Sequence, residues 1–368
     1  MTATFLSGTV IEVSRPDTPP GIRLAASLAT KIAADLGARV VKIEPPGGDP
    51  VRRMPPLLDK GDAGSSALFQ FLNTGKQAIV LDLEQSRGRD TLASLLAKAD
   101  AVVEAGDPTP DDGAGGSLVR VRLSPFGNRP DLRAVPVSEL TILALGGLLD
   151  LVGDPARAPL RLGGHQAAYS AGLAAYAGLM AGLMTRKRHG AGETVNISLL
   201  DVALWVNWKS PAGALLLGRA PTRQGPEAEW QVLPCSDGYI ALVYADKDWP
   251  ALCALAREPK LAVGEFANAA GRRSRRQEVL QLLAQAFAGR ARNELYAEIK
   301  ASGIPMGPVL SPAELLEDRQ YLARDFMAKV SHADFSAFSM PRVPLRWNGA
   351  GFQPRPAPDL PVAEEVIP

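Results

Sequence analysis

The chain has 368 residues, which at roughly 150 residues per domain predicts about two domains. Its 40 lysine and arginine residues nearly balance its 39 aspartate and glutamate residues, so no overall field draws it to nucleic acid or an anionic membrane. Two cysteines and three histidines without ligand spacing argue against a disulfide framework and against a metal site, and they suit a cytoplasmic location. The first residues lack the pattern of a secretory signal.

The first third of the chain alternates short apolar runs with helical patterns. Strands are expected at residues 10–13, 39–44, 78–83, 101–104 and 118–124. Helices are expected between them over 24–36, which ends before Gly37, and over 85–98. Strand–helix–strand repetition predicts parallel pairing with right-handed crossovers. This part therefore reads as a doubly wound, Rossmann-like α/β domain.

The middle of the chain is more helical. Buried helices are expected over 138–153 and 167–187, and residues 194–205 predict a strand that runs into a helix. Eighteen residues from Ala167 to Met184 carry no charge, and three basic residues follow them, which is the length of a short membrane span. Alanine and glycine dilute this stretch and allow close helix packing, so a core helix is expected and no membrane association.

The second half begins a smaller unit after residues 217–229, where charged residues become more frequent. A hairpin-like run at 237–245 opens it, which predicts a small α+β domain. Helices are expected in this unit around 248–257, 274–289 and 292–301. From Trp347 onward proline is frequent, and an extended surface tail is expected.

Two short segments have the composition of a ligand site. Residues 163–166, Gly-Gly-His-Gln, precede the small-residue helix, and they suit either a turn that caps the helix or a pocket where a ligand approaches the backbone. Residues 45–50 follow a predicted parallel strand and lead to Arg52 and Arg53, which suits either a solvated loop or contacts with phosphates. No nucleophile elbow, P-loop or dinucleotide motif is present in the sequence. Pattern alone thus leads only to a two-domain α/β protein.

Longer blocks carry a family resemblance. The run AADLGARVVKIEPPGGDP at 33–50 is similar to the pattern ADLGAxVIKxExPGGD, and similar blocks follow in the same order at 73–104, 123–131, 160–204 and 303–326. These patterns belong to the class III CoA-transferases, which include formyl-CoA transferase, carnitine CoA-transferase and α-methylacyl-CoA racemase. Because five blocks occur in order over almost the whole chain, we take the resemblance as significant.

The resemblance implies a large CoA-binding domain from residues 1–186 and 330–368 and a small domain from 227–310. Linkers at 187–226 and 311–329 would thread two subunits into an interlocked dimer. The substrates would be an acyl-CoA and a carboxylic acid, and an aspartate would attack the thioester to form a mixed anhydride and then an aspartyl-CoA thioester. The ADP part of CoA would lie near Asn73 and Lys76, with help from Arg52.

The chain departs from the family at its chemical centre. Counting back from Gly172, the position of the catalytic aspartate is occupied by Ala168, which has nothing to acylate. The histidine of the racemases corresponds to Ser138, and Glu139 follows where the family usually has an acid. The E-N-F motif is replaced at 104–106, and the loop after the first strand lacks the A-G-P pattern.

Three interpretations remain open at this point. The chain could be the non-nucleophilic subunit of a heteromeric CoA-transferase, paired with an aspartate-bearing paralogue. It could instead be an acyl-CoA racemase or isomerase, alone or as a homodimer, in which His165 acts as base and Glu139 as acid or orienting group. It could also be a non-enzymatic protein that binds CoA esters.

Overall fold

A computed structural model describes residues 6–58, 65–106, 116–132, 135–218, 223, 230–332 and 337–360. The chain divides into two compact units. The larger unit contains Met1–Val152, Pro159–Pro221 and Leu322–Pro368, and the smaller one contains Gly153–Ala158 and Thr222–Tyr321. The larger unit thus draws on both halves of the chain.

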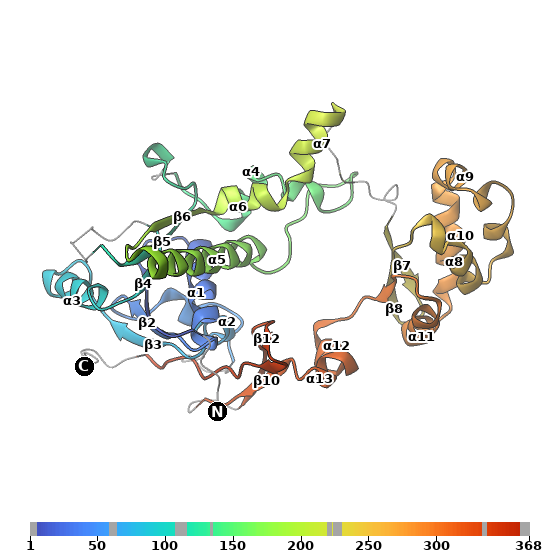
Figure 1. Ribbon diagram of the computed structural model, residues 1–368. Helices are drawn as coiled ribbons and strands as arrows, with labels where there is room; N and C mark the ends of the chain where they lie inside the picture. Colours follow the sequence, from blue (N-terminus) through green and yellow to red (C-terminus); the bar gives the residue numbers. More distant parts are fainter. Residues whose placement is uncertain are drawn as a thin grey trace. The chain divides into compact units, whose positions relative to one another are not determined.

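A six-stranded parallel sheet forms the centre of the larger unit (Figure 1). Its strands are β1 (Thr9–Ser14), β2 (Arg39–Glu44), β3 (Gln77–Val80), β4 (Ala101–Ala105), β5 (Val119–Ser124) and β6 (Thr194–Ser198). The strand order is β3-β2-β1-β4-β5-β6, so the chain first builds outward from β1 and then returns to the other side of it. Such a reversal creates a crevice at the carboxyl ends of β1 and β4, where ligands of open α/β sheets bind. The α/β class and the parallel sheet that the sequence predicts are confirmed.

Helices cover both faces of this sheet. Helices α1 (Pro20–Asp35) and α5 (Gln166–His189) pack on one face, and α3 (Ser86–Leu96) packs on the other. Alternate residues of a strand point to opposite faces, so Val10 joins the cluster under α1 while Ile11 joins the cluster under α3. Each half of the core is therefore built from every second strand residue.

Helix α5 approaches its neighbours through glycines. A Cβ atom at Gly172 would lie 2.8 Å from the carbonyl oxygen of Ala25 in α1. At Gly182 it would lie 2.5 Å from the side chain of Val119 in β5. By length and composition α5 is apolar enough to cross a membrane. One side of it, which includes Ala171, Ala175 and Gly182, is buried against α1 and the sheet.

The expected helix over 138–153 is wrong in its extent. The structure has α4 (Glu139–Leu145), followed by a single 3₁₀ turn at Leu149–Leu151. Gly147 has a φ of 74°, in the left-handed region that ends helices. The helical pattern of apolar residues continues past this point, but the backbone turns there.

The range expected as a linker, 187–226, contains regular structure in its described part. It supplies β6 to the sheet and then forms α6 (Leu199–Val206) and α7 (Lys209–Leu217). The range 311–329 similarly forms α12 (Pro312–Glu317) and α13 (Arg319–Ala323).

The smaller unit has one antiparallel sheet and several helices. The hairpin pairs β7 (Gln231–Cys235) with β8 (Gly238–Leu242), and β9 (Gly307–Pro308) joins β8. The expected run 237–245 is thus only the second strand of this hairpin. The helices are α8 (Trp249–Ala256), α9 (Ala269–Ser274), α10 (Arg276–Ala288) and α11 (Arg292–Ser302). One face of the sheet and the inner faces of the helices share a core that includes Ile240, Leu252 and Phe287.

The remaining elements belong to the larger unit. Helix α2 (Ala67–Leu72) lies between β2 and β3 in the chain. Hairpins β10 (Met327–Val330) with β11 (Phe338–Pro341) and β12 (Arg346–Trp347) with β13 (Ala350–Gly351) precede an extended segment, 352–360. This segment is not wholly on the surface as expected, because Ala357 is buried in an apolar cluster with residues of α1, α2 and α5.

Candidate functional site

Ala168 lies in the first turn of α5 and is completely buried. Its methyl group belongs to an apolar cluster whose other buried members are Leu24, Val51, Phe69, Leu72 and Ala357. A core residue therefore occupies the position at which the sequence resemblance leads us to expect a nucleophile.

The structure brings together Glu139 and His165, the two residues that the sequence proposes for catalysis. Nδ1 of His165 lies 2.8 Å from Oε2 of Glu139. The other carboxylate oxygen accepts hydrogen bonds from the backbone N–H groups of Ala167 at 3.0 Å and Ala168 at 3.2 Å. Glu139 therefore caps the N-terminus of α5, where a negative charge is stabilised by the helix dipole.

This contact fixes the orientation of the histidine ring. A carboxylate only accepts hydrogen bonds, so we assign the proton of the neutral ring to Nδ1, which leaves Nε2 as the accepting nitrogen. The ring of Tyr169 meets His165 edge-on, with 6.1 Å between ring centroids. Burial and the nearby Glu139 carboxylate raise the pKa of Tyr169. A carboxylate–histidine pair with an accepting Nε2 is able to exchange a proton with a ligand.

Ser138 has a structural task. Its Oγ accepts from the backbone N–H of Thr141, and Oγ1 of Thr141 accepts from the backbone N–H of Ser138 at 2.8 Å. This capping box fixes the start of α4 and thus the position of Glu139 in its first turn.

The predicted nucleotide residues Asn73 and Lys76 lie together in a buried polar network. Nζ of Lys76 donates to Oδ1 of Asn73 at 2.9 Å and to Oε2 of Glu12 at 2.8 Å. The amide of Asn73 donates to the carbonyl oxygen of Phe69. The Lys76 side chain has no exposed surface, and its ammonium group forms its ion pair and hydrogen bonds with groups of the protein.

Glu12 joins this network to a second lysine. Its Oε1 accepts from Lys42 at 2.6 Å, and Lys42 also pairs with Asp49 at 2.7 Å. Burial alone would raise the pKa of Glu12, but Lys42 and Lys76 hold that pKa well below its usual range. Burial, together with the charge of Lys42, lowers the pKa of Lys76 to about 8 despite the attraction of Glu12. The network ties β1, β2 and the turn before β3 together.

Arg52 is held by a carboxylate and by the C-terminal segment. It forms a two-pronged ion pair with Glu44, with N–O distances of 2.7 and 2.8 Å, and its guanidinium stacks over Phe69. It also donates to the carbonyl oxygens of Pro358 and Asp359. The neighbouring Arg53 is more exposed and donates to the carbonyl oxygen of Gly47.

The C-terminal segment also covers the turn at residues 73–76. The N–H of Gly75 donates to the carbonyl oxygen of Pro356 at 3.1 Å, and Arg355 donates to the carbonyl oxygen of Gly75 at 3.1 Å. Residues from the far end of the chain thus lie over the turn that resembles the family's N-x-N-K motif.

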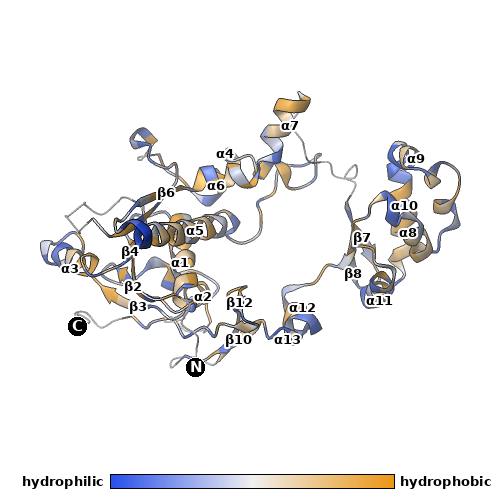
Figure 2. Cartoon of the chain, in the orientation of Figure 1, coloured by the Kyte–Doolittle hydropathy of each residue, from blue (hydrophilic) through white to orange (hydrophobic). Residues whose placement is uncertain are grey.

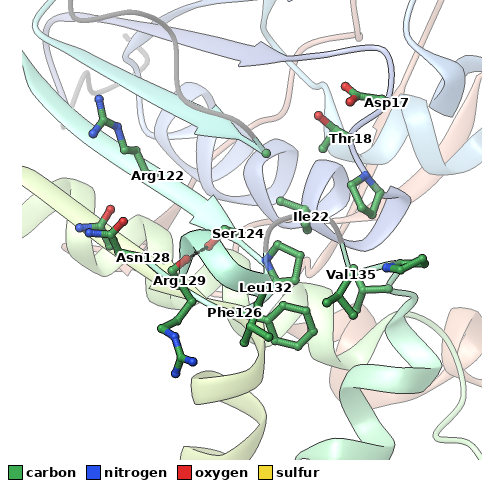
Figure 3. Close-up of a pocket in the computed structure, with 17 residues that line it drawn as sticks. Asp17, Thr18, Ile22, Arg122, Ser124, Phe126, Asn128, Arg129, Leu132 and Val135 are labelled. Carbon is green, nitrogen blue, oxygen red and sulfur yellow. Dashed lines mark hydrogen bonds between the residues drawn. The ribbon is translucent and has the colours of Figure 1, made fainter.

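A cavity of about 350 Å³ opens beside the switch point of the sheet (Figure 3). Its apolar lining includes Ile22, Phe126, Leu132, Val135 and Val137, and its polar lining includes Thr18, Arg122, Ser124, Asn128 and Asn196. The sequence reasoning missed this site. The signal was the alternation Val-Arg-Val-Arg-Leu in β5, which places Arg120 and Arg122 on one face of a strand whose other face is apolar.

The described part of the chain contains no group of three or more His, Cys, Asp or Glu residues that could hold a metal ion.

Several known proteins are similar to this chain in sequence or in structure. A succinyl-CoA:mesaconate CoA-transferase of Haloarcula marismortui is 28% identical over 334 residues, which cover 83% of this chain and 82% of that protein. A subunit of succinyl-CoA:(R)-benzylsuccinate CoA-transferase, BbsE of Thauera aromatica, is 34% identical over 225 residues, or 58% of this chain and 55% of that protein. The crystal structure of a CaiB/BaiF family protein from Brucella suis superposes with a TM-score of 0.83 at 28% identity, covering 96% of this chain and 95% of that one. The model of CoA-transferase family III matches residues 9–362, so this chain belongs to CoA-transferase family III.

Proposed function

We propose that this chain binds CoA or an acyl-CoA and serves as the non-nucleophilic subunit of a cytoplasmic, heteromeric CoA-transferase. The observation that carries the proposal is the burial of Ala168 among Leu24, Phe69 and Leu72. No aspartate or glutamate occurs from Gly163 to Leu173, so a shift in register supplies no alternative nucleophile. The aspartate that forms the anhydride and the thioester would then come from a partner of the same family. One relative, BbsE, is itself named as a subunit of a CoA-transferase.

An exposed apolar surface on α6 and α7 supports assembly with a partner. Trp205 is 77% exposed, and Leu215 and Leu216 are 87% and 83% exposed. Figure 2 shows the apolar end of α7. Contiguous apolar residues of this size are rare on the surface of a monomer and mark protein–protein contacts. We propose that the partner subunit covers this surface in a threaded dimer.

The proposed CoA site keeps the turn at 73–76 and Arg52 as its nucleotide region. Since Asn73 and Lys76 are buried and bonded to the protein, we give them the role of positioning this turn. We propose that Arg52, which is partly exposed on the loop after β2, contacts a phosphate of CoA while it stays paired with Glu44.

Reconstitution tests the proposed function. The purified chain is mixed with an aspartate-bearing paralogue. The molar mass of the resulting assembly is measured, and the transfer of CoA from an acyl-CoA to a free acid is assayed on the same sample. We expect a mixed dimer that is active and a separate chain that is inactive. Leu216→Glu should weaken the dimer, whereas Leu57→Glu, at a separate exposed leucine, should not. Transfer by this chain alone would contradict the proposal.

A second candidate is supported by the 2.8 Å contact between His165 and Glu139. In this alternative the chain is an acyl-CoA racemase or isomerase, and Nε2 of His165 removes the proton α to the thioester. Exchange of that proton with deuterium from solvent tests it directly. Exchange that is lost in His165→Gln would favour the second candidate, and absence of exchange in the wild type would eliminate it. If CoA esters bind and neither reaction occurs with any partner, the chain is a CoA-ester-binding protein.

A further inference from the structure

Three polar side chains form a row across the sheet beside the cavity. Glu104 on β4 is the register partner of Arg122 on β5, and Arg122 is the register partner of Asn196 on β6. Register partners on adjacent parallel strands direct their side chains to the same face, so these three groups are immediate neighbours. Arg122 and Asn196 both line the cavity.

Arg122 is a cation held in place from one side. Its Nε donates to Oε2 of Glu104 at 2.9 Å, and Glu104 is fully buried and also pairs with Arg120 at 3.3 Å. This leaves the two Nη groups of Arg122 without a protein acceptor among the residues that the structure describes. The amide of Asn196 likewise makes no side-chain hydrogen bond within those residues. A fixed guanidinium fork beside a free amide is the arrangement that recognises a carboxylate.

The wall opposite Arg122 combines apolar and polar side chains. Figure 3 shows Ile22 and Val135 on that side together with Asp17 and Thr18, which also line the cavity. The second arginine of the lining, Arg129, is occupied by a two-pronged ion pair with Asp131 at 2.7 and 2.9 Å. Among the lining residues that the structure describes, Arg122 is thus the cation with unpaired N–H groups, and Ile22 and Val135 lie across the cavity from it. Its volume of about 350 Å³ is within the range of small-molecule sites.

We propose that this cavity binds a carboxylic acid with an apolar body, such as an aryl-substituted or branched alkyl acid. One carboxylate would accept from the Nη groups of Arg122 and from the amide of Asn196, while the body packs against Ile22, Phe126 and Val135. A short dicarboxylate is disfavoured, because its second charge would face Ile22 and Val135 or the carboxylate of Asp17. The inference deepens the proposed function, on which it rests for the use of this acid as a partner in CoA exchange.

Calorimetry with 3-phenylpropanoate, 3-phenylpropanamide and succinate tests the proposal on the full chain. We expect 3-phenylpropanoate to bind at least tenfold more tightly than the amide or succinate. Arg122→Gln should weaken its binding at least tenfold, whereas Arg122→Lys, which keeps the charge but loses the fork, should weaken it about threefold. Arg39→Gln is the matched control, because Arg39 is exposed and lies at the amino end of β2, so binding should be unchanged.

Arg122→Gln removes one of the two arginines that pair with the buried Glu104, so it could also destabilise the fold. A second variant therefore tests the cavity without changing these ion pairs. Val135→Trp fills the cavity from an exposed position and leaves the ion pairs intact, and it should abolish binding of 3-phenylpropanoate. Equal binding of the acid and its amide, no binding of any acid to the wild type, or unchanged binding in both cavity variants would overturn the proposal. CoA binding is titrated separately on the same samples. A chain that binds the acid but no CoA ester would contradict the proposed function and leave the acid site standing.

Discussion

The carboxylate of Glu139 binds the backbone of Ala168. Its Oε1 lies 3.2 Å from the amide nitrogen of Ala168, at the position where the family resemblance places a catalytic aspartate. A negative charge is thus present at the N-terminus of α5, although it comes from α4 and is already paired with two N–H groups and with His165. The side chain of Ala168 points into the core instead. The N-terminus of α5 thus binds a carboxylate from α4, while the side chain at position 168 is part of the apolar core.

Ala168→Asp is therefore expected to destabilise the chain without restoring transfer. The new carboxylate would lie among Leu24, Phe69 and Leu72, and its burial without a partner should lower the free energy of unfolding by about 3 kcal/mol. Denaturant unfolding measures this. Ala177→Asp on the exposed side of the same helix is the control and should cost less than about 1 kcal/mol. An Ala168→Asp chain as stable as the control would show that the side chain at position 168 is accessible to solvent.

Glu139→Ala should lower the free energy of unfolding by about 1–2 kcal/mol, because two N–H groups of α5 lose their acceptor. Glu139→Gln keeps an acceptor oxygen, so it should lower the free energy of unfolding less than Glu139→Ala does. Thermal and denaturant unfolding compare the two variants. If both cost the same, the charge of Glu139 matters and not its hydrogen bonds to Ala167 and Ala168.

The core network predicts a dependence of stability on pH. The pKa of Glu12 is lower in the folded chain than its ordinary value of 4.5, so the stability it contributes is present above pH 4.5 and is lost as the pH falls below that value. Glu12→Gln should lose about 3 kcal/mol at neutral pH, because Lys42 and Lys76 lose a buried partner. It should also show a smaller decline of stability in acid. Parallel acid profiles for the variant and the wild type would exclude Glu12 as the titrating group.

Lys76→Met should lower the free energy of unfolding less than Glu12→Gln does, because Glu12 keeps its pair with Lys42. The pKa of Lys76 is about 8 in the folded chain against 10.5 ordinarily, so the unfolded chain binds more protons between these values. The stability of the wild type should therefore rise relative to Lys76→Met as the pH increases from 8 to 10.5. A constant difference across this window would mean that Lys76 titrates normally.

Lys76→Ala also tests the nucleotide region. If the buried ammonium positions the turn at 73–76, calorimetry should show CoA binding weakened about tenfold or more. Unfolding measurements on the same sample show how much stability is lost with it. Unchanged CoA affinity, or no CoA binding by the wild type, would contradict a nucleotide site at this turn.

Much of the large unit was predictable because strand and helix periods are strong there. The runs at 39–44 and 101–104 became β2 and β4 almost residue for residue, because short runs of valine and isoleucine between helical patterns are typical of buried parallel strands. The burial of their charged members Lys42, Glu44 and Glu104 was not predictable from that pattern. The end of α4 at Gly146–Gly147 was missed because apolar residues continue beyond it. Helix α7, with its exposed leucines, was missed because its pattern contains no polar face.

The candidate site was only partly accessible from sequence. The family spacing marked Glu139 as an acid of the site, but no pattern in the sequence shows that its carboxylate reaches both His165 and the start of α5. The burial of Lys76 could not be predicted from a turn motif, because its partner Glu12 is 64 residues away in the chain. The row of Glu104, Arg122 and Asn196 depends on the order and register of three strands, which local patterns do not specify.

Trapping of covalent intermediates shows whether this chain carries a nucleophilic carboxylate. The purified chain is incubated with an acyl-CoA, alone and with an aspartate-bearing partner, treated with hydroxylamine, and examined by peptide mass analysis. We expect no modified carboxylate on the chain alone and, in the mixed sample, modification of the partner's aspartate only. An acyl or CoA adduct on Glu139, or on any other acid of this chain, would contradict this expectation.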